Sequence, residues 1–392
     1  MPADPPRRRY VRTSPPTPTA LNTETRPSDE QRPSEALASL LGSDPPAPAR
    51  PHALVDAWPD TRPVPLDGWM ERNGFTPVWA GVLVFVLAFI AFQVIGGVAV
   101  AGGVGLDAAR SGEMPDLSDT AALIAARPHL VLGGNALGQA LAFGLVAWFA
   151  ARLSTRRPAA FLRMRTPDPA GLGLAAVGWA ALYPVVIALA QLNALLPLPP
   201  WLAGLDEMRG EMLEALLLGG ALSTPFLFLT VALVPAVFEE VLFRGYLQRQ
   251  AERRFGTRAA IVGVGVAFGL YHLSAAQALP LSVLGVYLCF VVWATGSLWT
   301  GVLVHLLNNG LAVLVAGVAR RTPGLDPDSL GEMGGPWYVA AGLAAVGAAG
   351  VLVVCRMLVA RRDAATGGRP DSRTDADPAL FSPAPASVAV PS

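Results

Sequence analysis

The chain has 392 residues, of which 53% are hydrophobic and only 15% are charged, and its mean hydropathy is +0.45. This balance argues against a soluble globular protein of this size and favours a membrane protein. The formal net charge is +0, so composition gives no support to nucleic acid as a partner. Cys289 and Cys355 both lie inside apolar runs, which argues against a disulfide framework.

The two ends of the chain differ in composition from its middle. Residues 1–70 are rich in Pro, Ser, Arg and Asp, and they lack the short apolar run of an export signal. Such a segment cannot bury enough apolar surface to offset the entropy of ordering its chain. We therefore predict disordered tails over residues 1–70 and 361–392, and a single helical membrane domain over residues 71–360.

Eight apolar segments follow one another in this middle region. A helix needs roughly 20 mostly apolar residues to cross a hydrocarbon core about 30 Å thick. The candidate segments are residues 75–100, 129–151, 172–195, 225–244, 259–274, 279–294, 298–318 and 337–358. The fifth and sixth are short and closely spaced, so the count is seven or eight. The predicted fold is an all-α polytopic bundle of about eight transmembrane helices.

The distribution of arginine predicts the orientation of the bundle. Arginines gather after the second segment, in RLSTRRPAAFLRMRT, and again after the fourth, whereas the loop between the third and fourth segments is acidic. Loops rich in arginine are retained in the cytoplasm. With eight crossings, both termini are then cytoplasmic, and we expect a multi-pass protein of the plasma (inner) membrane with membrane lipid as a partner.

The fourth segment carries charges that an ordinary membrane helix avoids. It reads PFLFLTVALVPAVFEEVLFRGYLQRQ and places Glu239, Glu240 and Arg244 at its cytoplasmic end. A central charge costs roughly 2.5–3.5 kcal/mol, so such groups persist only for a reason. Glu240 and Arg244 share a helix face, which permits an ion pair, while Glu239 points about 100° away. Glu239 is thus the carboxylate left for chemistry, and a purely supporting role and a catalytic role both stay open for the other two.

Two further apolar segments contain the remaining candidates. His272 lies in AFGLYHL, and His305 and Asn309 share a helix face in GSLWTGVLVHLLNNGLA. A carboxylate and an imidazole can together activate one water molecule, which suits Glu239 and His272. A second imidazole and an amide can donate hydrogen bonds to an oxyanion, each worth about 2.7–4 kcal/mol. His305 and Asn309 suit that role.

The elements EEVLFRG, FGLYH and HLLNN, in this order on separate apolar segments, closely resemble the EExxxR, FxxxH and HxxxN motifs of the CPBP family. This family comprises the CAAX-processing and bacteriocin-processing intramembrane proteases. The resemblance extends over residues 172–318. It implies an eight-helix fold with a catalytic cavity in the membrane, Glu239 and His272 as the water-activating pair, and His305 with Asn309 around the oxyanion.

The resemblance leaves the use of a metal open, because family members have been described both as metalloproteases and as metal-free glutamate enzymes. Glu239, His272 and His305 make a plausible zinc ligand set that leaves a position for water. The chain has no HExxH helix, however, and the three groups come from three segments. The favoured prediction is a glutamate-type protease without a cofactor, and the zinc-dependent enzyme is the alternative.

The expected function is therefore an intramembrane endopeptidase that hydrolyses peptide bonds without a covalent intermediate. Its expected partner is a peptide or protein substrate, membrane-anchored or prenylated, and not nucleic acid. A non-proteolytic immunity or scaffold protein that keeps the same motifs is the alternative of another class.

Overall fold

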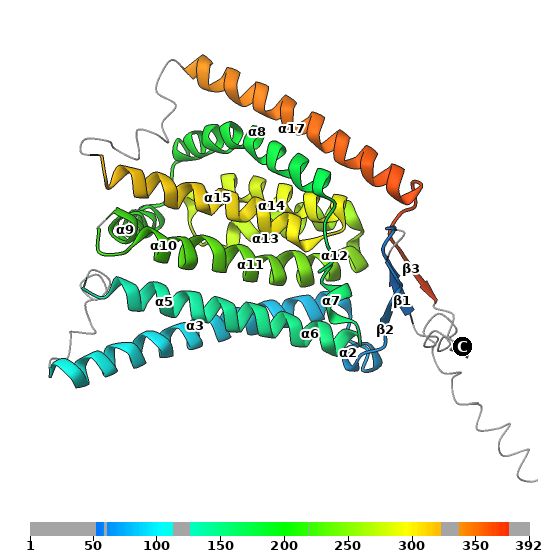
Figure 1. The fold of residues 1–392 in the computed structure, drawn as a ribbon, viewed down its shortest axis with the longest axis horizontal. Helices are drawn as coiled ribbons and strands as arrows, with labels where there is room; N and C mark the ends of the chain where they lie inside the picture. The colour runs from blue at the N-terminus through cyan, green and yellow to red at the C-terminus, as the bar shows by residue number, and fades with distance from the viewer. Residues whose placement is uncertain (1–51, 59–60, 113–125, 219, 323–336, 376–392) are drawn as a thin grey trace, which may run out of the picture. The chain divides into compact units, whose positions relative to one another are not determined.

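The computed structural model describes residues 52–58, 61–112, 126–218, 220–322 and 337–375. All of these residues belong to one compact unit of the chain, Arg50–Ser392. Figure 1 shows that they form layers of long helices, with three short strands at one end. The prediction of a polytopic helical membrane bundle is confirmed.

Seven helices among the described residues are long and apolar enough to cross a membrane. They are α3 (Pro77–Ser111), the helix Pro128–Ser154, α8 (Pro169–Ala194), the helix Thr224–Phe255, α14 (Ala275–Thr295), α15 (Leu298–Ala319) and α17 (Trp337–Thr366). The fifth predicted segment forms α13 (Thr257–Tyr271), which has 15 residues. At 1.5 Å per residue α13 is about 22 Å long, shorter than a hydrocarbon core of about 30 Å. Of the eight predicted segments, α13 is therefore the one that is too short to count as a spanning helix.

Two of the spanning helices contain π-helical segments. Pro128–Ser154 consists of α5 (Pro128–Gln139), η1 (Ala140–Leu145) and α6 (Val146–Ser154). Thr224–Phe255 consists of α10 (Thr224–Leu227), η2 (Phe228–Leu233), α11 (Val234–Glu240), η3 (Val241–Leu247) and α12 (Gln248–Phe255). Three shorter helices are α2 (Trp69–Arg72), α7 (Pro158–Phe161) and α9 (Pro200–Leu218). The predicted acidic loop thus contains a helix, α9.

Helix starts in this chain follow local sequence signals. Thr76, Asp168 and Ser223 each cap a helix, and the side chain of each accepts a hydrogen bond from a backbone N–H of the first turn. Each cap is followed within two residues by proline, whose missing N–H is not needed there. At the other end of α14, Gly296 adopts φ +65°, a conformation that glycine enters without steric cost.

The helices that carry the predicted site are neighbours. α8 lies between α17 and α14, α14 packs between α13 and α15, and α15 packs against η2 and α11. Inside, Phe243 contacts the rings of Phe268 and Tyr271 at centroid distances of 5.2 and 5.3 Å. This aromatic packing joins the helix of Glu239 to α13, at whose end His272 lies.

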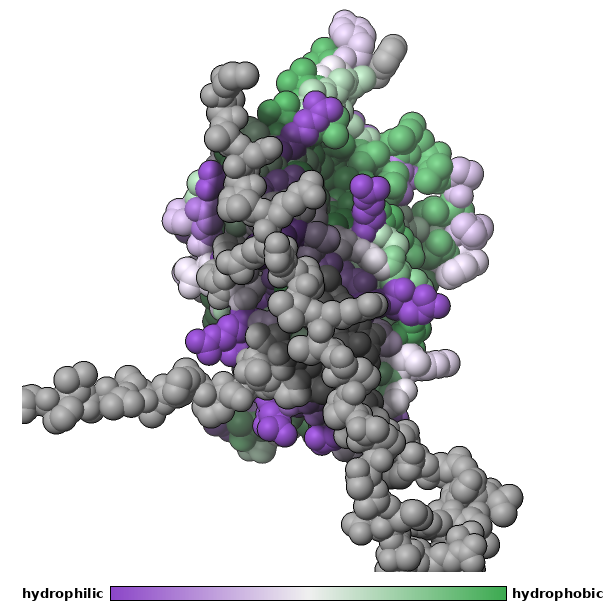
Figure 2. Space-filling model, turned by 90° about the vertical axis from the view of Figure 1, so that its right-hand side faces the viewer, coloured by the Kyte–Doolittle hydropathy of each residue, from purple (hydrophilic) through white to green (hydrophobic). Residues whose placement is uncertain are grey.

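The sides of the bundle are apolar and open. On α3, the side chains of Leu83, Leu87, Ile90 and Val94 are between 48% and 57% exposed. Figure 2 looks onto the end that carries the strands, where hydrophilic residues gather, while hydrophobic residues run back along the helices. An apolar surface of this extent suits a hydrocarbon environment rather than water.

Three strands join the two ends of the described chain. β1 (His52–Val55) pairs antiparallel with both β2 (Val64–Leu66) and β3 (Ser372–Asp375). The structure here differs from the predicted tails over residues 1–70 and 361–392, because it has strands in both and α17 continues to Thr366. Strands of three or four residues are too short to produce a readable alternation of apolar side chains. Residues 1–51 and 376–392 of those tails lie outside the described residues.

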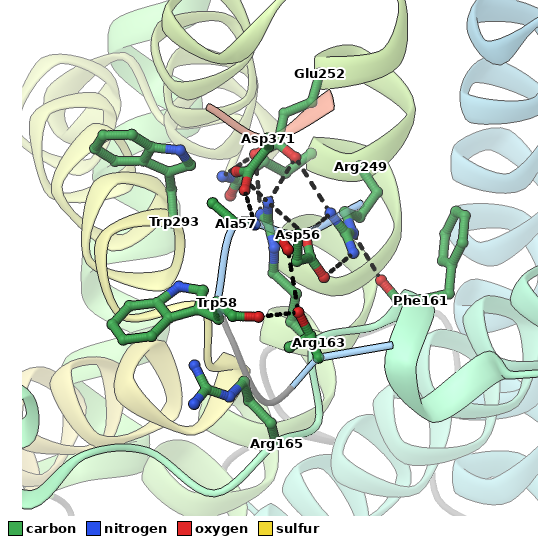
Figure 3. A network of polar contacts seen from close by, with 12 residues as sticks. Asp56, Ala57, Trp58, Phe161, Arg163, Arg165, Arg249, Glu252, Trp293 and Asp371 are labelled. Atoms are coloured by element: carbon green, nitrogen blue, oxygen red, sulfur yellow. Dashed lines mark hydrogen bonds and ion pairs between the residues drawn. The ribbon is translucent and has the colours of Figure 1, made fainter. Parts of the chain in front are cut away.

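Buried ion pairs fix the sheet to the helices (Figure 3). Arg249 of α12 donates two hydrogen bonds to the Asp56 carboxylate, at 2.6 and 2.7 Å. Arg163 donates two to Glu252, both at 2.9 Å. Burial on its own raises the pKa of Asp56, but the positive charges of Arg249 and Arg163 outweigh this effect and hold that pKa below its ordinary value. Asp56 therefore stays ionised and keeps β1 on α12.

Asp371 makes the equivalent attachment for the end of the chain. Its Oδ1 accepts hydrogen bonds from Arg362 at 2.7 Å and from the backbone N–H of Ala57 at 2.8 Å. Arg362 also donates to the carbonyl of Trp293. Together with the pairs of Asp56 and Glu252, these contacts balance three carboxylates against three guanidinium groups, a network that we call the terminal clasp.

Candidate active site

The helix Thr224–Phe255 places the two predicted carboxylates at its middle. Glu239 and Glu240 end α11, with the π segments η2 before it and η3 after it. Such π segments occur frequently at functional sites. Glu239 is 4% exposed, and Glu240 and Arg244 are fully buried. The helix continues through η3 and α12 to Phe255, so the pair does not lie at the helix end that we predicted.

Glu240 is the centre of a buried polar cluster. Its Oε1 accepts hydrogen bonds from Arg244 Nη1 at 2.7 Å and from His305 Nδ1 at 2.9 Å. Arg244 also donates to the carbonyl of Gly285 at 3.2 Å. A Cβ atom at Gly301 would lie only 2.7 Å from Oε2 of Glu240, so glycine there leaves room for the carboxylate. The ion pair that helix spacing permitted is therefore present, and it includes His305.

His305 and Asn309 continue this cluster along α15. A carboxylate only accepts, so His305 carries its hydrogen on Nδ1, and its Nε2 accepts from Asn309 Nδ2 at 3.2 Å. The same amide nitrogen donates to the carbonyl of Val231 at 3.2 Å. Asn308 Nδ2 donates to Asn309 Oδ1 at 3.2 Å. In this arrangement His305 and Asn309 present no unused donor to an oxyanion, which differs from the predicted geometry.

His272 lies at the end of α13 in a different arrangement. Its Nδ1 is 2.8 Å from the carbonyl oxygen of Phe268, which can only accept, so Nδ1 carries the hydrogen and Nε2 is the basic atom. The ring of Phe268 lies 4.9 Å from that of His272 and 5.7 Å from that of His305. The guanidinium of Arg244 lies 4.1 Å above the same ring. Phe268 thus separates His272 from the Glu240 cluster.

Glu239 is the unpartnered member of the site. Its Oε2 is buried and has no hydrogen-bond partner among the described residues. The carboxylate lies close enough to His272 and Tyr271 for its charge to act on both. A buried, unpaired carboxylate is costly, because nothing replaces its hydration. Oε2 of Glu239 is therefore a buried acceptor without a partner among the described residues, in the neighbourhood of His272.

The turn that carries His272 is held by residues that the sequence analysis did not identify. Leu273 has φ +51°, a strained conformation for a residue with a side chain, and its carbonyl accepts a hydrogen bond from Arg209 of α9 at 2.9 Å. Asp206 of α9 accepts from the backbone N–H of Ala276 at 2.9 Å. Asn193 of α8 donates to the Ala276 carbonyl at 3.1 Å. The sequence of the acidic loop predicts only the orientation of the bundle, and no sequence spacing links this loop to the His272 turn.

The predicted zinc ligands do not form a metal site in this arrangement. Among the residues that the structure describes, no three His, Cys, Asp or Glu side chains are placed to hold one metal ion. Both ring nitrogens of His305 are engaged, with Glu240 and with Asn309. The ligand set Glu239, His272 and His305 therefore does not fit zinc without a rearrangement of His305.

Comparisons with known proteins give one family. Residues 221–311 match the family described as type II CAAX prenyl endopeptidase Rce1-like. The matched range contains all six predicted site residues, from Glu239 to Asn309, and the predicted resemblance to intramembrane CAAX proteases is confirmed for it. Comparisons with curated proteins and with solved structures give no match.

Proposed function

We propose that this protein, whose residues 221–311 match the type II CAAX prenyl endopeptidase Rce1-like family, hydrolyses a peptide bond by means of a water molecule that Glu239 and His272 activate. The observation that carries the proposal is the buried Oε2 atom of Glu239, which has no hydrogen-bond partner among the described residues. Its neighbour Glu240 is paired with Arg244, whereas Glu239 forms no ion pair with a described residue and so can accept a hydrogen bond from water.

In the proposed mechanism, water bridges the Glu239 carboxylate and Nε2 of His272. The water gives one proton to Glu239 while its oxygen attacks the carbonyl carbon of the substrate. The tetrahedral intermediate then breaks its C–N bond, and the proton passes to the leaving amine. Each group here acts within the range of about 10²- to 10⁴-fold that positioned acids and bases provide.

Asn309 is proposed to stabilise the oxyanion, while His305 stays hydrogen-bonded to Glu240. The two hydrogen bonds of its amide nitrogen, to Val231 and to His305, are both 3.2 Å long and join neutral groups. A charged oxyanion is a stronger acceptor than a backbone carbonyl. The substrate therefore competes for this amide when charge develops, and the Glu240–Arg244 ion pair holds His305 during the exchange.

The strand-bearing end of the bundle is proposed to face the cytoplasm. The arginines that surround α7, α12 and the end of α17 lie at this end, where β1 and β3 also pair. Positive residues are retained on the cytoplasmic side. The expected substrate is a membrane-anchored or prenylated peptide or protein, and the direct test is its cleavage by purified protein in proteoliposomes. Absence of any cleaved product for a panel of such substrates would refute the proposal.

Metal removal is expected to leave the activity unchanged. Because the three candidate ligands do not form a metal site, exhaustive chelation followed by dialysis should leave the cleavage rate nearly unchanged, with a reduction of less than about twofold. Metal content of the purified protein is measured in parallel. Loss of activity on chelation with recovery on added zinc would establish the metalloprotease alternative instead.

Arg209 is expected to act as a positioning residue for His272. Arg209→Gln removes the hydrogen bond to the strained Leu273 carbonyl, and we expect kcat to fall about tenfold, equivalent to about 1.4 kcal/mol, with KM nearly unchanged. Arg209→Lys keeps a donor and should restore part of the rate. The matched control is Glu211→Gln, an exposed residue of the same helix. If Arg209→Gln lowers the Tm as well as kcat, and Arg209→Lys restores neither, the role of Arg209 is merely structural.

A further inference from the structure

A cavity at the strand-bearing end lies outside the candidate active site. It has a volume of about 350 Å³ and is bounded by the strand segment, by the connection between α6 and α8, and by the turn between α14 and α15. The charged residues of its lining are Asp56, Arg62, Arg157, Arg163 and Arg165. Among the described residues, four arginines and one aspartate thus line the cavity, and Arg165 is already engaged, since it donates to the carbonyl of Thr295.

The terminal clasp does not compensate this positive charge. Its three carboxylates are matched by Arg163, Arg249 and Arg362, so the clasp as a whole is neutral. Arg62 and Arg157 come in addition, and neither forms an ion pair with a described residue. Arg157 donates only to the carbonyl of Pro63, at 3.2 Å. The cavity therefore has a local excess of positive charge that an anion would neutralise.

Buried donors beside the cavity also lack partners. The Nε atom of Arg163 is buried without a hydrogen-bond partner, and the side chain of Arg163 is only 2% exposed. The indole Nε1 of Trp58 is likewise buried and unpartnered among the described residues. Trp58 lies against Gly296 in the cavity wall, where a Cβ atom would come within 2.4 Å of Nε1. Both atoms lie inside the cavity wall, so the groups that an anion in the cavity can reach are the guanidinium groups of the exposed Arg62 and the half-buried Arg157.

From these observations we propose that the cavity binds a phosphate-bearing anion. Guanidinium groups pair with phosphate through two parallel hydrogen bonds, and a cavity of this size accommodates a phosphate with a small substituent. With the proposed orientation, the cavity lies at the cytoplasmic end of the bundle, on the side where anionic lipid headgroups are enriched. The headgroup of an anionic phospholipid and free phosphate share the chemistry that the cavity recognises.

Bound phosphate would connect three parts of the chain that are distant in sequence. Arg62 belongs to the β1–β2 connection, Arg157 precedes α7, and Gly296 precedes α15. The clasp residue Arg163 in turn pairs with Glu252 on α12. Occupancy should therefore stabilise the attachment of the sheet to the helix that carries Glu239.

The test measures thermal unfolding of the full chain in nanodiscs. One arm uses phosphatidylcholine with inorganic phosphate against chloride at equal ionic strength, and the other compares phosphatidylcholine with phosphatidylglycerol. We expect a higher Tm with at least one anion. In the variant Arg62→Gln/Arg157→Gln, the apparent Kd for that anion should rise at least about tenfold, because two charge-assisted hydrogen bonds are lost. Arg258→Gln, an exposed arginine outside the cavity, should bind as the unaltered chain does.

The two arms separate the two sources of phosphate. A rise with phosphatidylglycerol alone identifies a lipid headgroup, and a rise with inorganic phosphate identifies a soluble anion. The single variant Arg62→Gln guards against misfolding, since Arg62 is exposed and makes no contact in the clasp. A Tm that responds to neither anion, or that responds equally in the double variant, would overturn the proposal.

Discussion

Replacing Glu239 by Gln is expected to reduce cleavage by about 10²- to 10⁴-fold without lowering the stability of the protein. Gln has nearly the same shape but cannot accept the proton of the attacking water. Because the buried Oε2 of Glu239 has no hydrogen-bond partner among the described residues, replacement of the carboxylate by a neutral amide removes a desolvation cost and breaks no ion pair in the described part of the chain. The cleavage rate in proteoliposomes and the Tm in detergent measure the two effects.

Loss of activity with an unchanged Tm would show that Glu239 takes part in the reaction rather than in holding the fold together. His272→Gln is the companion variant, and it should lose activity to a similar extent. Full activity of Glu239→Gln would remove Glu239 from the mechanism. A biological function that persists in a strain carrying this inactive variant would instead favour the scaffold interpretation.

Glu240→Gln should instead lower the stability of the folded protein. Arg244 is fully buried, and its ion pair with Glu240 is 2.7 Å long. Removal of one partner of a buried pair leaves an uncompensated charge and costs about 3–5 kcal/mol. His305 would keep only a neutral amide oxygen in place of the carboxylate as its acceptor. Equilibrium unfolding in mixed detergent is the appropriate measurement.

A double-mutant cycle completes the test of Glu240. In Glu240→Gln/Arg244→Met both charges are absent, so a substantial part of the stability should return. Gln93 on α3, an exposed polar residue, offers a control in Gln93→Leu. If Glu240→Gln unfolds at the same detergent concentration as the unaltered chain, the ion pair contributes nothing to stability and Glu240 is not a supporting residue.

Helix periodicity was sufficient to predict the separate directions of Glu239 and Glu240. A helical step of about 100° separates neighbouring side chains, and four residues bring Glu240 and Arg244 together. The same reasoning could not place His305 beside Glu240, because that contact joins α11 to α15 across the bundle. It also could not find Arg209, whose role depends on where α9 folds back over the His272 turn.

The tails show a different limit of sequence interpretation. Asp56, Arg249 and Asp371 are charged residues in polar surroundings, and each by itself is typical of a solvated segment. Only their pairing makes them structural, and that pairing spans most of the chain. Hydropathy was a better guide for the long helices, because their apolar length is a local property.

The terminal clasp has a consequence for biosynthesis. Ala57 and Asp371 are hydrogen-bonded although 314 residues separate them. A chain that enters the membrane from its N-terminus makes β1 long before β3, so one edge of β1 stays unpaired throughout translation. Every spanning helix must be in place before that edge closes. A product truncated after α17 would contain the whole candidate active site and still leave β1 paired on one side only, so the terminal clasp would lack Asp371.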